Sequence, residues 1–298
     1  MLTVIAIVLD GLVYASWLFM VSVGLTLIYG VMRILNIAHG SLYALGAYAA
    51  ASVVGAYLAG GYPPFASYAL LLGAAIVVGV FFGLLIERGI LRLMYGRDEV
   101  LMVLVTYAVF LILEDAIKLI WGVDPYFASE PYGLLGNVDV LGLPYPIYDF
   151  GLIGLALVSG AGVWWSLNRT RLGKLLVAVI HDREMSVACG INVTAIFLVT
   201  FIAGSVLGAL GGAFTAPKVS VVPGIGVEVI VLAFAVVVTG GMGSIGGAMI
   251  GALIVGLARA AAVHLLPQAE LFVIYLVMAM VLTFRPRGLF SIAEARKI

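Results

Sequence analysis

The chain has 298 residues, of which 64% are hydrophobic and 10% are charged, and its mean hydropathy is +1.23. Soluble domains carry about 25% charged residues, so a chain with so few charges could not cover its surface in water. The formal net charge of zero suggests no nucleic-acid partner, and the single cysteine, Cys189, excludes an intramolecular disulfide framework. Composition therefore indicates a protein surrounded mainly by membrane lipid.

Apolar runs long enough to cross ~30 Å of hydrocarbon recur along the whole chain. They are apolar on every face, which favours helices over the alternating strands of a membrane β-barrel. The first run has no basic region before it and no cleavage site, so we expect it to remain in the mature protein. The sequence predicts an all-α polytopic membrane protein with eight or nine membrane helices, some of them broken or re-entrant. They lie near residues 5–30, 39–58, 66–87, 99–121, 149–167, 193–215, 227–240, 245–265 and 269–284.

A polar cluster containing Asn36, His39 and Ser41 interrupts the pattern between the first two runs. A helix cap or a structural hydrogen bond would explain Asn36 and His39, and contact with a transported molecule is the alternative. All three residues are candidate residues of a translocation pathway.

Ionisable residues inside membrane spans are functional candidates by default. Glu114 and Lys118 are four residues apart in the fourth run, so we expect them to pair within one helix. Glu228 and Arg259, in the seventh and eighth runs, are candidates for a pair that holds an outer gate. The alternative is that Arg259 extends to the outer membrane interface.

The loop of residues 168–192 is long for a connection between membrane helices. It contains a short amphipathic segment, residues 181–189, with Asp182 near its start and Gly190 just after it. An acidic residue suits a helix N-terminus, and glycine suits a helix stop. Such a helix can lie on lipid headgroups or dock into a groove of a soluble partner, and both interpretations are open at this point.

The stretch from Thr239 to Gly247, which includes Ser244, is too rich in glycine to hold a regular helix. Each glycine costs about 1 kcal/mol relative to alanine in a helix. One interpretation is an interrupted helix that lines a translocation route, with Thr239 and Ser244 as pathway candidates. The other is an ordinary tight cytoplasmic turn.

Basic residues gather in four regions that fall on one side of the membrane if nine segments span it. The positive-inside rule makes that side cytoplasmic and therefore predicts a cytoplasmic C-terminus. The opposite, extracytoplasmic loop covers residues 122–148 and contains no lysine or arginine. The basic residues are Arg33; Arg88, Arg92 and Arg97; Arg169, Arg171, Lys174 and Arg183; and Arg285, Arg287, Arg296 and Lys297.

Several short motifs follow one another in order from residue 29 to residue 290. With this set the chain resembles the branched-chain amino acid permease family of ABC importers, of the smaller inner-membrane subunit type. It departs from the usual family pattern at Leu35 and Ile37, which leaves the substrate open. The motifs are Tyr29-Gly30-Val31, Leu35 to Gly40, Leu45 to Tyr48, Glu87-Arg88 with Arg92, Leu172-Gly173, Gly190-Ile191-Asn192, Gly240 to Ser244 with Gly247-Ala248, and Arg285 to Phe290.

The resemblance implies one transmembrane permease domain over residues 1–298 with the ABC importer permease fold. It also implies a second homologous permease subunit, two cytoplasmic ATPase subunits and an extracytoplasmic substrate-binding protein. It identifies the 168–192 loop as the coupling loop, where Glu184, Ala188 and Gly190 match the family's order of Glu, Ala and Gly. With Asp182 they form the expected ATPase-coupling set.

The function that we expect is import of branched-chain or related small amino acids across the cell inner membrane by alternating access. Import of urea, short amides or small carboxylates by the same family is the alternative. An ion-coupled secondary transporter ranks lower, because its acidic groups should lie near the membrane midplane. The chain has no Walker A pattern, no catalytic constellation and no metal-ligand spacing, so we expect a transport subunit without its own cofactor. ATP-Mg would then bind the partner subunits.

Overall fold

The computed structural model describes residues 2–290, and most of them are helical. Eight helical segments of this range are long and apolar enough to cross a membrane. They are α1 (Leu2–Met32), α2 (His39–Ala59), Pro64–Met94 with α3 (Ser67–Ile86), α5 (Glu99–Trp121), α7 (Ile147–Arg169), α10 (Val193–Thr215), α12 (Ile245–Leu265) and Pro267–Phe284 with α13 (Glu270–Phe284). The predicted all-α polytopic membrane fold is confirmed.

A further apolar helix, α11 (Ile225–Gly240), has 16 residues. At 1.5 Å per residue it is about 24 Å long, which is less than the hydrocarbon thickness of about 30 Å. The short seventh run therefore forms a helix, but one that is not long enough to cross the bilayer upright by itself. The described part of the chain thus has eight long apolar segments and one short one, in agreement with the expected eight or nine.

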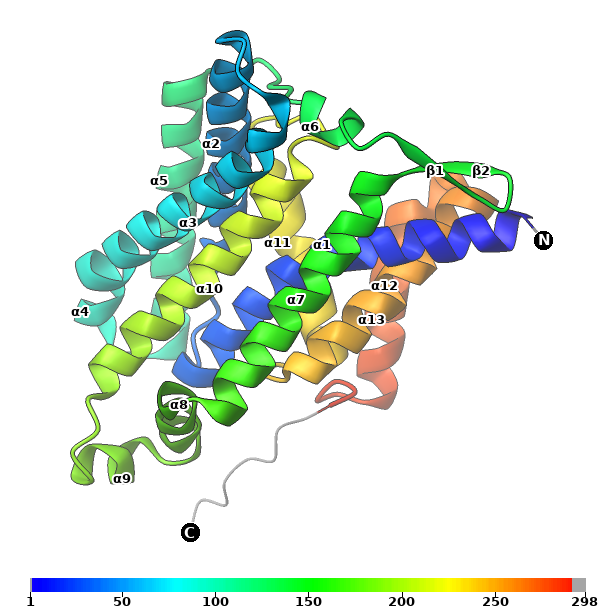
Figure 1. Cartoon of the computed structure of the whole chain (residues 1–298). Coiled ribbons are helices and arrows are strands. Elements are labelled where there is room, and N and C mark those ends of the chain that lie inside the picture. Colours follow the sequence, from blue (N-terminus) through cyan, green and yellow to red (C-terminus); the bar gives the residue numbers. More distant parts are fainter. Residues whose placement is uncertain (1, 291–298) are drawn as a thin grey trace.

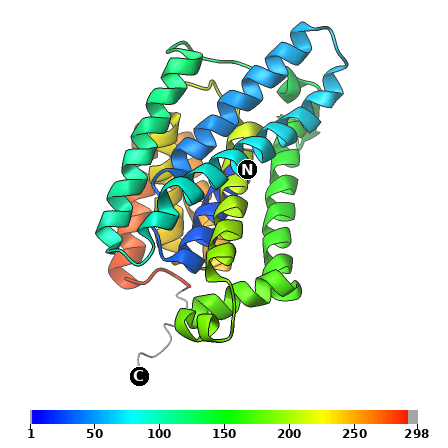
Figure 2. The same cartoon turned by 90° about the vertical axis from the view of Figure 1, so that its left-hand side faces the viewer.

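The two ends of the bundle differ in their connections (Figure 1). One end carries α8 (Arg171–His181), α9 (Arg183–Ala188), α4 (Arg92–Met94) and the last described residues. Figure 2 shows the helices of residues 171–188 at that same end after a quarter turn. The basic regions up to Arg287 therefore gather at one end, as the charge pattern predicted, whereas Arg296 and Lys297 lie outside the described residues.

The loop of residues 122–148 lies at the opposite end and is more structured than the sequence suggested. It contains α6 (Glu130–Gly133) and an antiparallel hairpin of β1 (Asn137–Val140) and β2 (Leu143–Pro146). The two turn residues, Leu141 and Gly142, have φ angles of 56° and 90°. Positive φ at both positions is the signature of the type I′ turn, which matches the twist of the paired strands.

Helices α1, α2 and α10 pack backbone against backbone at the centre of the bundle. A Cβ atom on Gly24 would lie 2.6 Å from the Gly204 oxygen, and one on Gly204 would lie 2.8 Å from the Gly24 oxygen. In the same way, a Cβ on Gly212 would overlap the carbonyl oxygen of Tyr43. Membrane helices associate through such close packing because lipid supplies no hydrophobic drive between them. The glycines at 204 and 212 therefore allow this close approach of the three helices.

The glycine-rich stretch forms a tight turn between α11 and α12. Gly241 and Gly243 have φ angles of 110° and 83°, and the Ser244 hydroxyl caps α12 by accepting a hydrogen bond from the Gly247 amide at 3.1 Å. The last described segment docks on this turn, since the Leu289 and Phe290 amides donate to carbonyl oxygens of residues 239 and 240. The predicted break is confirmed, and of the two interpretations the tight turn describes it.

The third span contains an irregular turn at the basic end of the bundle. A π-helix of five residues, η2 (Glu87–Leu91), follows α3 directly and leads into α4. Short 3-10 helices, η1 (Pro64–Ala66) and η3 (Pro267–Ala269), begin the third and last spans. Single π turns are rare and occur often at functional sites. The π-helix η2 is therefore a candidate functional feature at this end of the bundle.

Candidate functional site

The predicted coupling loop forms two short helices joined at Asp182. The Thr170 hydroxyl caps α8 by accepting from the Gly173 amide at 3.0 Å, and the Asp182 carboxylate caps α9 by accepting from the Met185 amide at 2.9 Å. The predicted helix N-terminus at Asp182 is confirmed, but the single segment 181–189 is wrong. His181 instead ends α8, a separate helix. A capping threonine and regularly spaced leucines are the sequence signals for this helix.

Helix α9 is exposed at the basic end of the bundle. Glu184, Ala188 and Gly190 are all exposed, and Gly190 has a φ angle of +81°, which favours glycine. Met185 and Val187 are 61% and 57% exposed, although both are apolar. The structure thus brings the coupling candidates together on one short exposed segment with an apolar surface, and their role in coupling stays a prediction.

A chain of side-chain contacts joins α9 to the third span. The Arg183 guanidinium lies 5.2 Å from the centre of the Phe197 ring, and Phe197 packs edge-on against Tyr95 at 5.1 Å. The Tyr95 hydroxyl donates to the Glu87 carboxylate at 2.6 Å. Burial and the adjacent Glu87 carboxylate raise the pKa of Tyr95 above its usual range, so its hydroxyl stays a donor at neutral pH. Glu87 is fully buried and begins the π-helix, so these contacts connect α9 with the irregular turn.

The pathway candidates Asn36, His39 and Ser41 are fully buried near the start of α2. The His39 imidazole shares a hydrogen bond with the Val21 carbonyl at 3.0 Å, and the Ser41 hydroxyl donates to the Phe110 carbonyl at 3.3 Å. These contacts fit the structural interpretation for His39.

The helix-cap interpretation of Asn36 is wrong. The N-cap of α2 is Ala38, which has no capping side chain. Both polar atoms of the Asn36 amide are buried without a hydrogen-bond partner among residues 2–290. Thr239 is also fully buried, with its hydroxyl unpaired in the same described range. Whether these residues meet a transported molecule stays a prediction.

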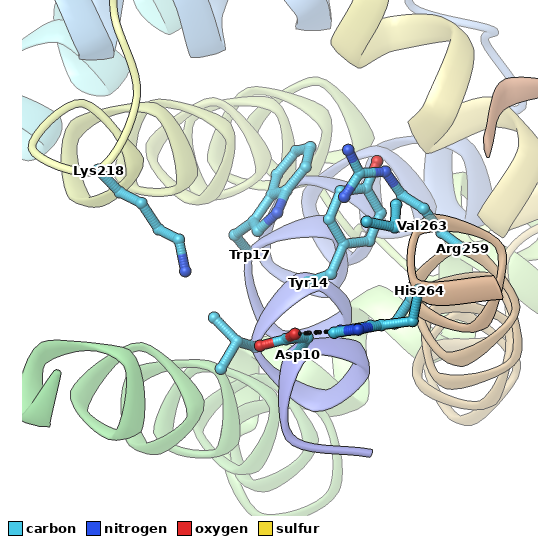
Figure 3. A pocket seen from close by; sticks show the side chains of 9 residues that line it. Asp10, Tyr14, Trp17, Lys218, Arg259, Val263 and His264 are labelled. Atoms are coloured by element: carbon cyan, nitrogen blue, oxygen red, sulfur yellow. Dashed lines mark hydrogen bonds and ion pairs between the residues drawn. The ribbon is translucent and has the colours of Figure 1, made fainter. Parts of the chain in front are cut away.

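A pocket of about 260 Å³ whose lining includes charged side chains lies near the hairpin, since Tyr145 of β2 contacts its residue Asp10. It lies between α1, α12 and the connection from α10 to α11 (Figure 3). We refer to it as the outer pocket. Its polar and aromatic lining consists of Asp10, Tyr14 and Trp17 from α1, Lys218 from the connection, and Arg259 and His264 from α12.

Each charged group of the outer pocket has a partner on another element. The Asp10 carboxylate bonds to the His264 imidazole at 2.7 Å and accepts from the Tyr145 hydroxyl at 3.2 Å. Lys218 forms an ion pair with Asp149 of α7 at 2.7 Å. Burial and the nearby Asp10 carboxylate raise the pKa of Tyr145 to about 12, so its hydroxyl remains a donor.

Arg259 is held between two neighbours. Its guanidinium lies 3.9 Å from the centre of the Tyr14 ring and forms an ion pair with Glu270 of α13. The predicted pair with Glu228 is therefore wrong, because Arg259 pairs with Glu270 at the start of the next helix. Glu228 itself is exposed at the start of α11.

The predicted pair of Glu114 and Lys118 is also wrong. Lys118 bonds to Asp115 at 3.1 Å, whereas Glu114 is buried and accepts from the Gly224 amide at 3.2 Å. Gly224 precedes α11, so Glu114 satisfies an amide at a helix start, where negative charge is favoured.

Sequence reasoning missed Asp10 and Lys218 as site residues. Asp10 is an ionisable residue within the first apolar run, and this signal alone marks it as a functional candidate. Its partner His264 is 254 residues away, so no local pattern could have joined the two. Lys218 follows a proline after α10, at a position where it could be taken for an ordinary loop residue.

The family model for the branched-chain amino acid transport system permease component matches residues 7–282. The chain belongs to this family. The match confirms the resemblance drawn from the motifs and makes the chain a multi-pass membrane permease.

Curated relatives match this permease over nearly its whole length. The high-affinity branched-chain amino acid transport system permease protein BraD of Pseudomonas aeruginosa is 29% identical over 97% of the chain and 96% of its own length. LivH of Escherichia coli K12, another high-affinity permease protein for branched-chain amino acid transport, is 24% identical over the same shares. The ribose import permease protein RbsC of the same strain is 30% identical over 79% of this permease and 71% of its own length. No solved structure matches the chain.

Proposed function

We propose that this permease is the transmembrane subunit of an ATP-driven ABC importer for branched-chain or related small amino acids. The main support for this proposal is α9, a capped helix that exposes Met185 and Val187 at the basic end of the bundle. Apolar side chains exposed together on a short helix favour docking into a groove of a protein partner. The partner would be a cytoplasmic ATPase subunit that binds ATP-Mg.

The proposed complex has two permease subunits of this family, two ATPase subunits and a substrate-binding protein on the extracytoplasmic side. The chain would lie in the cell inner membrane with its basic end and C-terminus in the cytoplasm. ATP binding would move α9, and the contacts from Arg183 through Phe197 to Tyr95 supply a route for that movement into the third span. Such a movement favours one state only if its contacts differ between the two states.

The names of BraD and LivH, both permeases for branched-chain amino acids, support that cargo. Ribose is the competing cargo, because the ribose permease is 30% identical to this chain. The charged side chains of the outer pocket favour a substrate with charged groups over a neutral sugar. Urea, short amides and small carboxylates remain further alternatives within the family.

The test is transport by the complex purified from its host and reconstituted in liposomes with its binding protein. We expect uptake of radiolabelled leucine that requires ATP and continues when ion gradients are dissipated. Uptake of ribose in place of leucine would contradict the proposed cargo. Uptake driven by an ion gradient without ATP would contradict the proposed mechanism.

The coupling role is tested with Glu184→Ala and Gly190→Ala, both on the exposed segment. We expect either change to reduce ATPase assembly or transport by about tenfold, and we expect Glu184→Ala to leave the unfolding temperature of the bundle unchanged. Replacing Gly190 also strains the backbone by about 1–2 kcal/mol, since a side chain disfavours positive φ. Glu99→Ala, at the exposed start of α5, is the matched control. Normal assembly and transport in both coupling variants would overturn the assignment.

A further inference from the structure

The outer pocket holds a basic side chain on each side of a pair of aromatic rings and an acidic side chain below them. In Figure 3 Lys218 extends into the open space from one side, Arg259 lies behind Tyr14 on the other, and Asp10 lies below Trp17. Tyr14 and Trp17 pack edge to face at 5.0 Å and separate these charges. The pocket thus combines both signs of charge with an apolar surface, which are the elements of an amino acid.

We propose that the outer pocket is a transit site that binds a zwitterionic, apolar amino acid, with its ammonium group at Asp10 and its carboxylate at Lys218. The proposal rests on the function proposed above and names the residues that recognise the substrate. The side chain of the amino acid would lie against Tyr14 and Trp17.

The three charged groups keep free hydrogen-bonding capacity despite their ion pairs. A carboxylate has about four acceptor positions, and two on Asp10 serve His264 and Tyr145. Lysine has three donors and arginine has five, whereas Lys218 uses one for Asp149 and Arg259 uses one for Glu270. The Asp10, Lys218 and Arg259 side chains are 44%, 30% and 29% exposed, so a small molecule can reach them.

The pocket offers bonding groups of both signs, which favours a zwitterion. Asp10 offers a carboxylate, whereas Lys218 and Arg259 offer cationic groups. A zwitterion brings one charge of each sign and no net charge. A carboxylic acid or an amine of the same shape would form charge-assisted bonds with only one of the two kinds of group.

The size of the pocket agrees with a single amino acid. Pockets for drug-sized ligands measure about 300–1,000 Å³, whereas the outer pocket measures about 260 Å³. The two aromatic rings provide apolar contact for an aliphatic side chain but no enclosed cavity. Binding should therefore be weak, as suits a site from which the substrate must leave again.

Binding at this site would also compete with contacts between helices. The Asp10–His264 bond joins α1 to α12, and the Arg259–Glu270 pair joins α12 to α13. An amino acid that takes over part of these bonds removes contacts that hold one arrangement of the helices. A ligand shifts a conformational balance through such differential contacts, so occupancy and opening would be linked.

The experiment is saturation-transfer NMR with the full chain in nanodiscs and millimolar L-leucine. Two analogues are tested beside it: leucinamide, which lacks the carboxylate, and 4-methylpentanoate, which lacks the ammonium group. We expect leucine to receive saturation and each analogue to bind at least tenfold more weakly, since a charge-assisted bond is lost. Equal binding of all three molecules, or no binding of leucine, would overturn the proposal.

Variants locate the site. Asp10→Asn and Lys218→Met should each weaken leucine binding at least tenfold, whereas Asp115→Asn and Lys118→Met should leave it unchanged. The second pair is the matched control, because Lys118 and Asp115 form an exposed ion pair at 3.1 Å outside the pocket. The analogue comparison uses the unaltered chain, so it stands even if a variant fails to fold.

The outcome is separable from that of the proposed function. ATP-dependent leucine uptake with unchanged half-saturation in the Asp10 and Lys218 variants would overturn the site and leave the importer standing. Leucine binding that depends on these residues, in a complex whose uptake needs no ATP, would support the site and contradict the importer.

Discussion

At the residue scale, the packing of this permease depends on positions where no side chain fits. The Gly46 and Gly212 positions face backbone atoms of α10 and α2, and a Cβ on either would overlap a carbonyl oxygen. Backbone cannot move aside as the end of a flexible side chain can. These positions therefore set how closely α2 and α10 approach.

We expect Gly212→Ala to lower the free energy of unfolding by about 1–3 kcal/mol, the usual cost of overpacking a close contact. The measurement is thermal unfolding of the purified chain in detergent. Gly154→Ala on α7 is the control, because nothing in the described structure lies within 4 Å of its added Cβ. That control should be neutral or should stabilise the helix by up to about 1 kcal/mol. Equal losses in both variants would contradict the packing argument.

Single residues were predicted well where the cause is local. Asp182 caps a helix because a carboxylate next to free amides is favourable within one turn, and the sequence shows that turn. Arg259 was paired with the wrong carboxylate because its partner depends on how α12 and α13 pack. No spacing rule contains that information.

At the element scale, a chain of contacts from Arg183 to Glu87 connects α9 with the bundle. It crosses from a short exposed helix through α10 to a π-helix, and its last bond joins Tyr95 to a fully buried carboxylate. Without the tyrosine hydroxyl, this buried carboxylate has one hydrogen bond fewer. The link therefore depends on a single hydroxyl group.

Tyr95→Phe removes this hydroxyl and keeps the aromatic contact with Phe197. A hydrogen bond within a protein contributes about 0.5–1.5 kcal/mol. We therefore expect the number of ATP molecules hydrolysed per leucine transported to rise severalfold, with nucleotide affinity unchanged. Tyr107→Phe is the control, since Tyr107 is 46% exposed on α5, away from the link. An unchanged ratio in Tyr95→Phe would show that the bond plays no part in coupling.

The elements themselves followed from the sequence to different degrees. Membrane helices were predicted because long apolar runs have one stable form in lipid. The hairpin of residues 137–146 was missed, although the positive φ angles at Leu141 and Gly142 fit its two-residue turn. Helix α8 was not predicted, because its basic residues interrupt the apolar pattern that identifies the membrane helices.

At the scale of the whole molecule, the hairpin lies at the end of the bundle opposite the basic end, and the outer pocket contacts the hairpin through the bond of Asp10 to Tyr145. This arrangement separates the surface proposed for the ATPase from the pocket proposed for the substrate. The helices between them are in backbone contact, so packed helices and no mobile linker connect the two regions within the described residues. The two ends were distinguished from sequence by charge alone, since lysine and arginine avoid translocated loops.

The single cysteine provides a test of orientation. Cys189 is free and exposed beside α9, so a membrane-impermeant maleimide should label it in inverted vesicles and not in right-side-out vesicles. The chain is expressed without ATPase subunits to keep this surface open. Asp139→Cys in a Cys189→Ser background should show the reverse pattern, because Asp139 lies in the hairpin at the other end. Labelling of both positions from one side would contradict the topology.

The paired glycines carry a consequence for how such a chain can change over generations. Gly24 with Gly204 and Gly240 with Gly247 exclude each other's side chains reciprocally. A damaging replacement in a core is often rescued when its neighbour becomes smaller, but here the neighbour is already the smallest residue that exists. A genetic suppressor of Gly204→Ala can therefore never arise at position 24. Compensation for Gly204→Ala must come from a neighbour that can still become smaller, such as Ile28, whose side chain also lies against position 204.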